Sequence, residues 1–457
     1  MRSLLLVASF VALILRVHAA HQFNVDAAHR ELIGMLTNFI RIDTSTAATK
    51  GAEYLKSFLD REGIASEIVN LEPEHGNLIA RLKGNGAKRP LLLMGHIDVV
   101  GVEREKWTID PFGGVIKDGY IYGRGAQDDK SMTAANLIIF LALHRLKVPL
   151  DRDVIFLAEA GEEGAPYLGI NFLVKNHWEK IDCEYAINEG GSLVQRDGKV
   201  RMVRVATAEK VPTPMMLTAK GVSGHGSKPR PDNAIVHLAK AIAKFDSWQP
   251  PMRLNETTRE YFKRLAEVSS PDKASLFRNL EKPDVQEQLR LTDFTHNSML
   301  RTTISPNMIR GGFRQNVIPG DATATLDVRA LPDEDLKSFT NLLAQVINDP
   351  AITINPLGSS RQPTAPVPLD TELFQAFERA QKRMFPDAIT VPMMTTGATD
   401  SAQLRAKGVK AYGINVIADE ADSALMHGND ERVSVEALRG FLEYLWQVVT
   451  EVAASKT

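Results

Sequence analysis

The sequence predicts an α/β fold in which one α/β domain is interrupted by a smaller α+β domain. Up to about residue 207, apolar runs of strand length alternate with longer amphipathic segments, as in sheets covered by helices on both faces. The next strand-like runs alternate between apolar and polar residues, which is typical of half-exposed strands. From about residue 366 the first pattern returns. We therefore expect the α/β domain at 21–208 and 361–457 and the inserted domain at 209–360.

The α/β domain should begin with strands and helices in alternation. Strands are expected at 90–94, 153–158, 185–188 and 409–417, and helices at 132–146, 170–178 and 435–452. In the inserted domain, strands are expected at 215–219 and 322–328, and helices at 233–245 and 333–347. The stretch 254–297 is polar, helical in tendency and poorly periodic, so it is interpreted as an insertion within that domain.

The first twenty residues resemble an export signal. Arg2 precedes an apolar run at 4–15, and small residues at 17–19 suit cleavage after residue 19 or 20. The run is shorter than the roughly 20 residues that span a bilayer, and Arg16 ends it. We expect an exported protein, periplasmic or secreted, without a membrane span in the mature chain. A signal retained as an anchor is the alternative.

Composition excludes several function classes. The chain of 457 residues is 44% hydrophobic and 24% charged, as in ordinary globular proteins. Lys and Arg number 54 and Asp and Glu 56, a net charge of −2, so no overall field favours nucleic acid. Cys183 is the only cysteine, which excludes intrachain disulfides, cysteine-based zinc ribbons and iron–sulfur clusters. Metal ligands must therefore be His, Asp or Glu.

Candidate metal ligands stand where the predicted strands end. The segments are Gly95-His96-Ile97-Asp98, Gly161-Glu162-Glu163, Asn188-Glu189 and Met426-His427, with Asp128-Asp129 just before a helix. Each alone has a structural explanation, such as a helix cap or a solvated turn. Ligands collect at the carboxyl ends of strands in open α/β sheets, so their joint occurrence indicates a metal centre.

The spacing of these residues suits a hydrolytic metal site. His96 and Asp98 are two apart on extended chain and point to one side, so Asp98 could accept the second ring N–H of His96. The adjacent Glu162 and Glu163 cannot point the same way. One can bind metal while the other remains free as a base.

Together these motifs resemble those of the M20 metallopeptidase family. Tyr-Gly-Arg-Gly-Ala-Gln-Asp-Asp-Lys at 122–130 and Gly-Glu-Glu-Gly at 161–164 are among the segments that carry the likeness, in family order over nearly the whole chain. The lead-in from Trp107 to Gly114 is most similar to the carboxypeptidase S and N-acyl amino acid hydrolase branch. The resemblance implies a zinc-peptidase-like α/β catalytic domain with an inserted α+β lid and dimerisation domain.

The resemblance also implies roles for the motif residues. Asp128 would bridge two metal ions, with His96 and Glu189 on one ion and Glu163 and His427 on the other. Glu162 would be the general base, and Asp98 would orient His96. Nitrogen and oxygen ligands without thiolate favour two Zn²⁺ per chain, with Co²⁺ or Mn²⁺ as substitutes.

Four residues outside the metal motifs resemble the family's substrate-binding segments. His225 would reach the active site of a partner subunit and stabilise the oxyanion, which implies a homodimer formed through the inserted domain. Asn316 and Arg329 would hold the oxyanion or the substrate carboxylate. Gly397 would bind that carboxylate through its backbone, although Thr396 and Ala398 depart from the family pattern.

The implied reaction is hydrolysis of an amide or peptide bond next to a free carboxylate. A metal-bridging hydroxide would attack the amide carbon while Glu162 acts as the base, and the substrate would be a small peptide or an N-acyl amino acid. Two alternatives stay open. One is a relative of the dipeptidase or aminopeptidase type, and the other is a catalytically inactive metal-binding scaffold.

Overall fold

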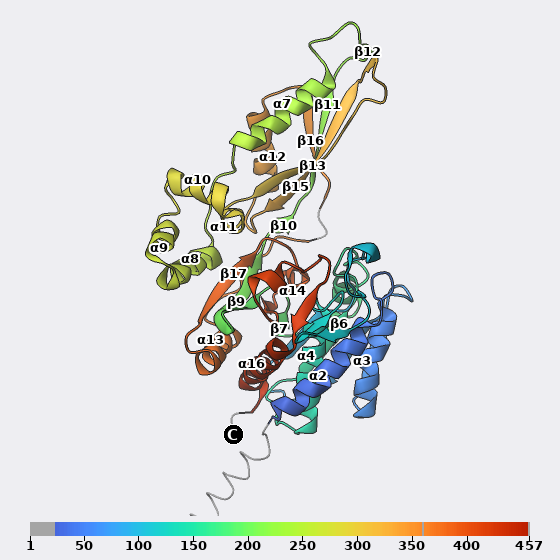
Figure 1. Ribbon diagram of the computed structural model, residues 1–457, viewed down its shortest axis with the longest axis vertical. Coiled ribbons are helices and arrows are strands. Elements are labelled where there is room, and N and C mark those ends of the chain that lie inside the picture. The colour runs from blue at the N-terminus through green and yellow to red at the C-terminus, as the bar shows by residue number, and fades with distance from the viewer. Residues whose placement is uncertain (1–22, 359–360, 456–457) are drawn as a thin grey trace, which may run out of the picture. The chain divides into compact units, whose positions relative to one another are not determined.

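The computed structural model describes residues 23–358 and 361–455, so the predicted export signal lies outside the described residues. The chain divides into two compact units (Figure 1). Unit 1 comprises the described residues of Met1–Val205, Pro368–Thr390 and Gly408–Thr457, and unit 2 comprises Ala206–Val367 and Val391–Lys407. The domain boundaries expected at 208/209 and 360/361 stay predictions.

Unit 1 is built on a mixed sheet with a parallel centre. The strands lie in the order β1 (Ser66–Val69), β2 (Asn77–Leu82), β6 (Val154–Glu159), β3 (Leu91–His96), β7 (Tyr185–Asn188), β18 (Lys410–Gly413), β9 (Lys199–Glu209), β8 (Ser192–Arg196) and β19 (Ile417–Ala418). Strand β17 (Ile389–Thr395), which pairs with β9, and the last residues of β9 belong mostly to the sequence ranges of unit 2. Strands β6, β3, β7 and β18 are parallel to one another. Their carboxyl ends therefore meet at one edge of the sheet.

Helices cover the central strands of this sheet. Helix α4 (Lys130–Arg145) contacts β3 and β6, and is buried on nearly its whole circumference because α2 (Val25–Ile40) and α16 (Val435–Ala453) pack against it. The remaining helices of unit 1 are α3 (Thr49–Arg61), η1 (Arg104–Lys106), α5 (Ile170–Asn176), α6 (Trp178–Ile181), α13 (Glu372–Met384) and α15 (Glu420–Ser423). The expected α/β class is confirmed.

A second, small sheet of unit 1 joins residues that are distant in sequence. It consists of β4 (Val115–Lys117), β5 (Tyr120–Tyr122) and β20 (Arg432–Ser434). In the antiparallel β5–β20 pair, Tyr122 faces Arg432. This pairing brings the chain before Asp128 beside the chain after His427.

Unit 2 has two layers. Its sheet contains β10 (Val211–Pro212), β11 (Met215–Lys220), β13 (Thr303–Gly311), β15 (Asp321–Ala330) and β16 (Ile352–Pro356). Helices α7 (Ala234–Ser247) and α12 (Leu336–Ile347) pack on one face, where alternate side chains of β15 are buried. The two-residue strands β12 (Gly224–His225) and β14 (Val317–Ile318) form a separate pair.

The segment predicted as an insertion is helical. It contains α8 (Glu256–Val268), α9 (Pro271–Arg278), α10 (Pro283–Thr292) and α11 (Phe294–Met299), and α14 (Ser401–Ala406) completes the helices of unit 2. The side chain of Asn255 accepts from the N–H of Thr258, and the Thr258 hydroxyl lies against the Asn255 N–H, a reciprocal cap that fixes the start of α8.

One predicted strand is wrong in its extent. The apolar run 409–417 forms two strands, β18 and β19, because β18 pairs with β7 whereas β19 pairs with β8. The chain leaves the first pairing after Ile414, whose N–H donates to the carbonyl of Asn188. An apolar run does not reveal a change of partner strand, so the break was not visible in the sequence.

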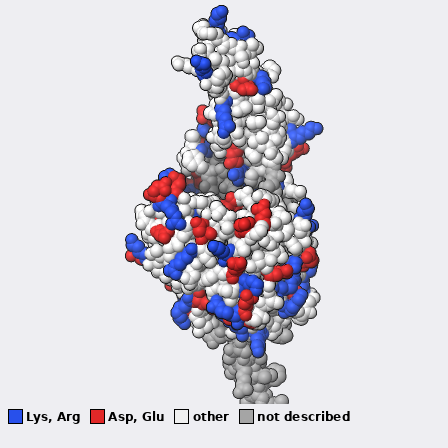
Figure 2. All heavy atoms as spheres, turned by 90° about the vertical axis from the view of Figure 1, so that its right-hand side faces the viewer, with Lys and Arg blue, Asp and Glu red and all other residues white. Residues whose placement is uncertain are grey.

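Charge is dispersed over the surface, as the near-zero net charge suggests. Figure 2 shows acidic and basic side chains interspersed on the face that it displays. Within residues 23–358 and 361–455, we find no helix with the length and apolar character needed to cross a bilayer.

Candidate metal centre

The first ligand candidate, His96, is the last residue of β3 and is 2% exposed. Its Nδ1 lies 2.9 Å from the carbonyl oxygen of Asp98 and 3.7 Å from the Asp98 carboxylate. The backbone carbonyl, rather than the expected carboxylate, is therefore the nearer acceptor for the Nδ1 proton. With that proton on Nδ1, the lone pair of Nε2 is available to bind a metal ion.

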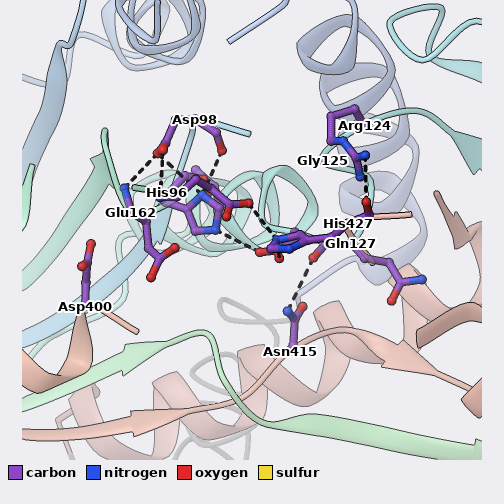
Figure 3. Close-up of polar contacts among 12 residues, drawn as sticks. His96, Asp98, Arg124, Gly125, Gln127, Glu162, Asp400, Asn415 and His427 are labelled. Carbon is purple, nitrogen blue, oxygen red and sulfur yellow. Dashed lines mark hydrogen bonds and ion pairs between the residues drawn. The ribbon is translucent and has the colours of Figure 1, made fainter. Parts of the chain in front are cut away.

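The Asp128 carboxylate contacts two histidines that are far apart in the sequence. Its Oδ1 lies 2.9 Å from His96 Nε2, and its Oδ2 lies 3.0 Å from His427 Nε2 (Figure 3). Asp128 itself is buried, two residues before α4. A carboxylate with one oxygen toward each of two imidazoles has the arrangement needed to bridge two cations.

The two glutamates follow β6 in a tight turn at Gly161. Gly161 has a φ of +95°, and a Cβ there would lie 2.4 Å from the carbonyl oxygen of Ala165, so only glycine fits. The Asp98 carboxylate accepts from the N–H of Gly161 at 2.8 Å, of Glu162 at 3.3 Å and of Glu163 at 3.1 Å (Figure 3). Asp98 therefore fixes the turn that presents both glutamates.

The ligand atoms of the candidate residues form two groups that share His96. Glu163 Oε1 lies 3.0 Å from His427 Nε2. The ligand atoms of His96, Asp128 and Glu163 lie within 4.8 Å of one another, and so do those of His96, Glu162 and Glu189. Glu189 directly follows β7. The structure thus brings all five predicted metal ligands and the predicted base together at the carboxyl ends of the parallel strands.

Electrostatics in this cluster favour cations. Hydrogen bonds from Asp128 and Glu163 raise the pKa of His427 to about 10. Burial lowers the pKa of His96, but the hydrogen bond and charge of Asp128 outweigh burial and hold that pKa well above its usual value. Burial, followed by the charge of Glu162, raises the pKa of Glu189 well above its ordinary range. The site accumulates negative charge that divalent cations would neutralise.

The donor set fits two divalent ions. Two imidazole nitrogens and three carboxylates converge without a thiolate, a combination that suits zinc and also admits cobalt or manganese. Asp128 contacts both histidines, so a single carboxylate can serve two ions.

The predicted residues of unit 2 lie in three separate places. His225 and Asn316 are exposed neighbours at the β12–β14 pair, where the Gly226 N–H donates to the Asn316 carbonyl at 2.9 Å. Arg329 lies on the helix-free face of β15 and pairs with Asp327, Nε to Oδ1 at 2.8 Å. Gly397 is exposed in the turn between β17 and α14. Only His225 and Asn316 are brought together.

Sequence reasoning missed one interaction beside the metal ligands. The Arg124 Nη1 donates to Glu431 Oε2 at 2.6 Å, and the two side chains are 3% and 0% exposed. Their separation of about 300 residues hides the pairing, although both belong to motifs that contain a ligand.

Comparisons with known proteins show which family the chain resembles. Residues 92–451 match the model of Peptidase family M20/M25/M40. Probable carboxypeptidase S-like 2 of Dictyostelium discoideum is 27% identical over 388 residues, 82% of this chain and 74% of that protein. The human N-fatty-acyl-amino acid synthase/hydrolase PM20D1 is 27% identical over 401 residues, 84% of this chain and 78% of that protein.

A solved structure has the same fold. The M20 family metallo-carboxypeptidase Sso-CP2 of Sulfolobus solfataricus aligns with a TM-score of 0.69 and 19% identity, covering 92% of this chain and 99% of that one.

Proposed function

Because this chain belongs to Peptidase family M20/M25/M40 and is thereby a hydrolase, we propose that it cleaves an amide or peptide bond next to a free carboxylate with the aid of two Zn²⁺ ions. The observation that carries this proposal is the position of Asp128, with one carboxylate oxygen at each of two histidines. Two imidazoles and several carboxylates at one edge of the sheet form a donor set that suits divalent metal ions.

We infer the assignment of residues to each ion that the family resemblance implies. His96 and Glu189 would hold one ion, Glu163 and His427 the other, and Asp128 would bridge them. Bound divalent ions would act as Lewis acids that polarise the scissile carbonyl and make water nucleophilic near neutral pH. The carbonyl of Asp98 keeps the Nδ1 proton of His96 in place, so Nε2 stays directed at the site.

Glu162 is the proposed proton carrier. Its carboxylate lies within 4.8 Å of the ligand atoms of His96 and Glu189, while Asp98 holds its backbone N–H. Glu162 would take a proton from the attacking water at one carboxylate oxygen. It would then donate that proton to the nitrogen of the leaving amine, which prevents the amide from re-forming.

The proposed substrate is a small peptide or an N-acyl amino acid. Arg329 offers a guanidinium on the helix-free face of β15, where Asp327 holds it now. A substrate carboxylate would compete with Asp327 for the same planar fork. The human relative is named as an N-fatty-acyl-amino acid synthase/hydrolase, which supports an N-acyl amino acid as the first compound to test.

The proposed assembly is a homodimer through unit 2. Strand β13 is a sheet edge nine residues long whose side chains are exposed from Ser305 to Gly311, including Met308 at 52% and Ile309 at 62%. A long, exposed edge with apolar side chains is a template for pairing with another strand. A second copy of β13 would cover it, and His225 would then act in the partner's site.

The proposed location is outside the cytoplasm. This proposal rests on the apolar run and small residues of the first twenty positions alone.

A paired substitution tests the proposed chemistry. Glu162→Gln should leave about two ions per chain and lower kcat by about 10³-fold or more, because the proton carrier is lost while the ligands remain. The matched control is Glu163→Gln, which should lose one ion. Metal content by atomic emission and turnover on N-acyl amino acids provide the measurements. Near-normal activity of Glu162→Gln would refute the assignment of the base.

A substrate panel tests the required carboxylate. N-acyl amino acids should be cleaved, whereas the matching N-acyl amino acid amides should not, since they lack the carboxylate. Cleavage of free dipeptides but not of their N-acetylated forms would instead support a dipeptidase or aminopeptidase.

A further inference from the structure

The loops that carry Asp128 and His427 are joined by a buried ion pair. Arg124 lies in the first loop and Glu431 in the second, and their side chains are 3% and 0% exposed. The Nη1–Oε2 distance is 2.6 Å. A buried ion pair is weak evidence for stability, because desolvation offsets most of the attraction. Its other hydrogen bonds show what the pair holds in place.

Glu431 binds the backbone that delivers Asp128. Its Oε1 accepts from the N–H of Gln127 at 2.7 Å and of Asp128 at 3.1 Å, and its Oε2 accepts from the N–H of Gly125 at 3.2 Å. Three amides of one turn thus converge on a single carboxylate. The Glu431 carbonyl also accepts from the N–H of Gly123 at 2.9 Å, so side chain and backbone hold the same turn.

Arg124 binds the backbone that delivers His427. Its Nη2 donates to the carbonyl of Gly428 at 2.9 Å and to the carbonyl of His427 at 3.2 Å. Figure 3 shows Arg124, Gln127 and His427 at one end of the site. Both loops are therefore fixed to one planar guanidinium and to the carboxylate that it binds.

His427 needs such support more than the other ligands do. Its side chain is 52% exposed, compared with 2% for His96 and 12% for Glu163, so packing does not fix it. Its φ is +62°, in the left-handed region that a residue other than glycine rarely adopts unless its surroundings hold it. The carbonyl that accepts from Arg124 belongs to this residue.

We propose that Arg124 and Glu431 are positioning residues that hold His427 at the distance from Asp128 required to bind the second metal ion. This inference rests on the proposed two-metal site. Within the described residues, Arg124 forms hydrogen bonds to the His427 loop and none to His96. Loss of Arg124 should therefore weaken the His427-side ion selectively.

Arg124→Met tests the proposal, because it removes the donors at similar side-chain volume and leaves Glu431 its three amides. Chelator competition with Zn²⁺ should show the His427-side ion bound about 10–100-fold more weakly and the other ion changed by less than about threefold. Adding Arg124→Met to His427→Ala should change the affinity of the remaining ion by less than about threefold. Comparison of the two single variants with the double variant shows which ion's affinity depends on Arg124.

A second buried arginine serves as the matched control. Arg152 is 0% exposed and pairs with Glu372 at 2.6 Å, but it contacts neither ligand loop in the described structure. Arg152→Met, the same change at this second site, should lower the melting temperature of metal-free protein without changing either affinity. Arg124→Lys keeps the charge but loses the fork, so it should weaken the His427-side ion less than Arg124→Met does.

Two results would overturn the positioning role. One is unchanged affinity for both ions in folded Arg124→Met and Arg124→Lys. The other is an equal loss at both ions, which would indicate general destabilisation. Failure of the proposed function is distinguishable, since it would appear as wild-type protein that binds no divalent ions.

Discussion

The candidate metal centre of unit 1 and the predicted substrate residues of unit 2 differ in how the protein holds them. His96, Asp128 and Glu163 are buried or nearly so and contact other ligands of the centre. His225 and Asn316 are exposed, and among the described residues the hydrogen-bond partner of the His225 ring is the nearby Ser227, whose Oγ lies 2.7 Å from Nδ1. The first group is organised within one chain. The second is organised only locally, so we expect it to be completed by a substrate and a second chain.

The sharpest test of the self-contained group is Asp128→Asn. An amide cannot bridge two cations, so both ions should be lost and turnover should fall on the order of 10⁴-fold or more. Metal content after dialysis is the measurement. Tight retention of two ions would contradict the bridge.

The exposed group should show its dependence on a partner through His225→Ala. If His225 stabilises the oxyanion, kcat should fall by about 10²–10³-fold while metal content stays unchanged. Neither His225→Ala nor Glu162→Gln homodimers should turn over well, but mixed dimers would contain one complete site. No recovery after verified subunit exchange would argue that His225 acts within its own chain, or not at all.

The edge of unit 2 offers a weaker perturbation. Ile309→Lys places a charge on β13 and should raise the dimer dissociation constant by about 100-fold. Sedimentation velocity over a concentration series measures this effect. Thr323→Lys, on the neighbouring inner strand, is the control and should leave the constant within about threefold. If the wild-type protein is a monomer over the whole concentration series, the proposed dimer through β13 is refuted.

The exposure of His225 does not mean that unit 2 is loosely packed. Unit 2 also contains a buried lysine, Lys210, whose titration tests how well this unit excludes water. Burial lowers the pKa of Lys210 to about 7, and its Nζ donates to the Ser298 carbonyl and the Thr303 hydroxyl. The unfolded chain binds this proton up to about pH 10.5, so stability should rise between pH 7 and pH 9. Relative to Lys210→Met, wild type should gain about 2 kcal/mol in urea unfolding over that range. Equal pH dependence would mean that Lys210 is solvated.

The family, the α/β class and the convergence of most candidate residues could be predicted, because His96, Glu163 and Glu189 lie at or just after the ends of the parallel strands β3, β6 and β7, and Asp128 just precedes α4. The group that accepts the Nδ1 proton of His96 could not be predicted, since the carbonyl and the carboxylate of Asp98 are equally close in sequence. The Arg124–Glu431 ion pair could not be predicted from the sequence either. It depends on the β5–β20 pairing, which no local pattern encodes.

That pairing also sets an order of events during synthesis. The predicted ligands extend from His96 to His427, and β20, the strand of the small sheet that comes last in sequence, directly precedes α16. A nascent chain can form the parallel strands β6, β3 and β7 early, yet the Asp128 carboxylate gains its second histidine only once residue 427 has been made. Loop closure over some 300 residues makes this contact slow to form. Metal capture should therefore be a late, post-synthetic step, and a chain that ends before residue 427 should accumulate without a complete centre.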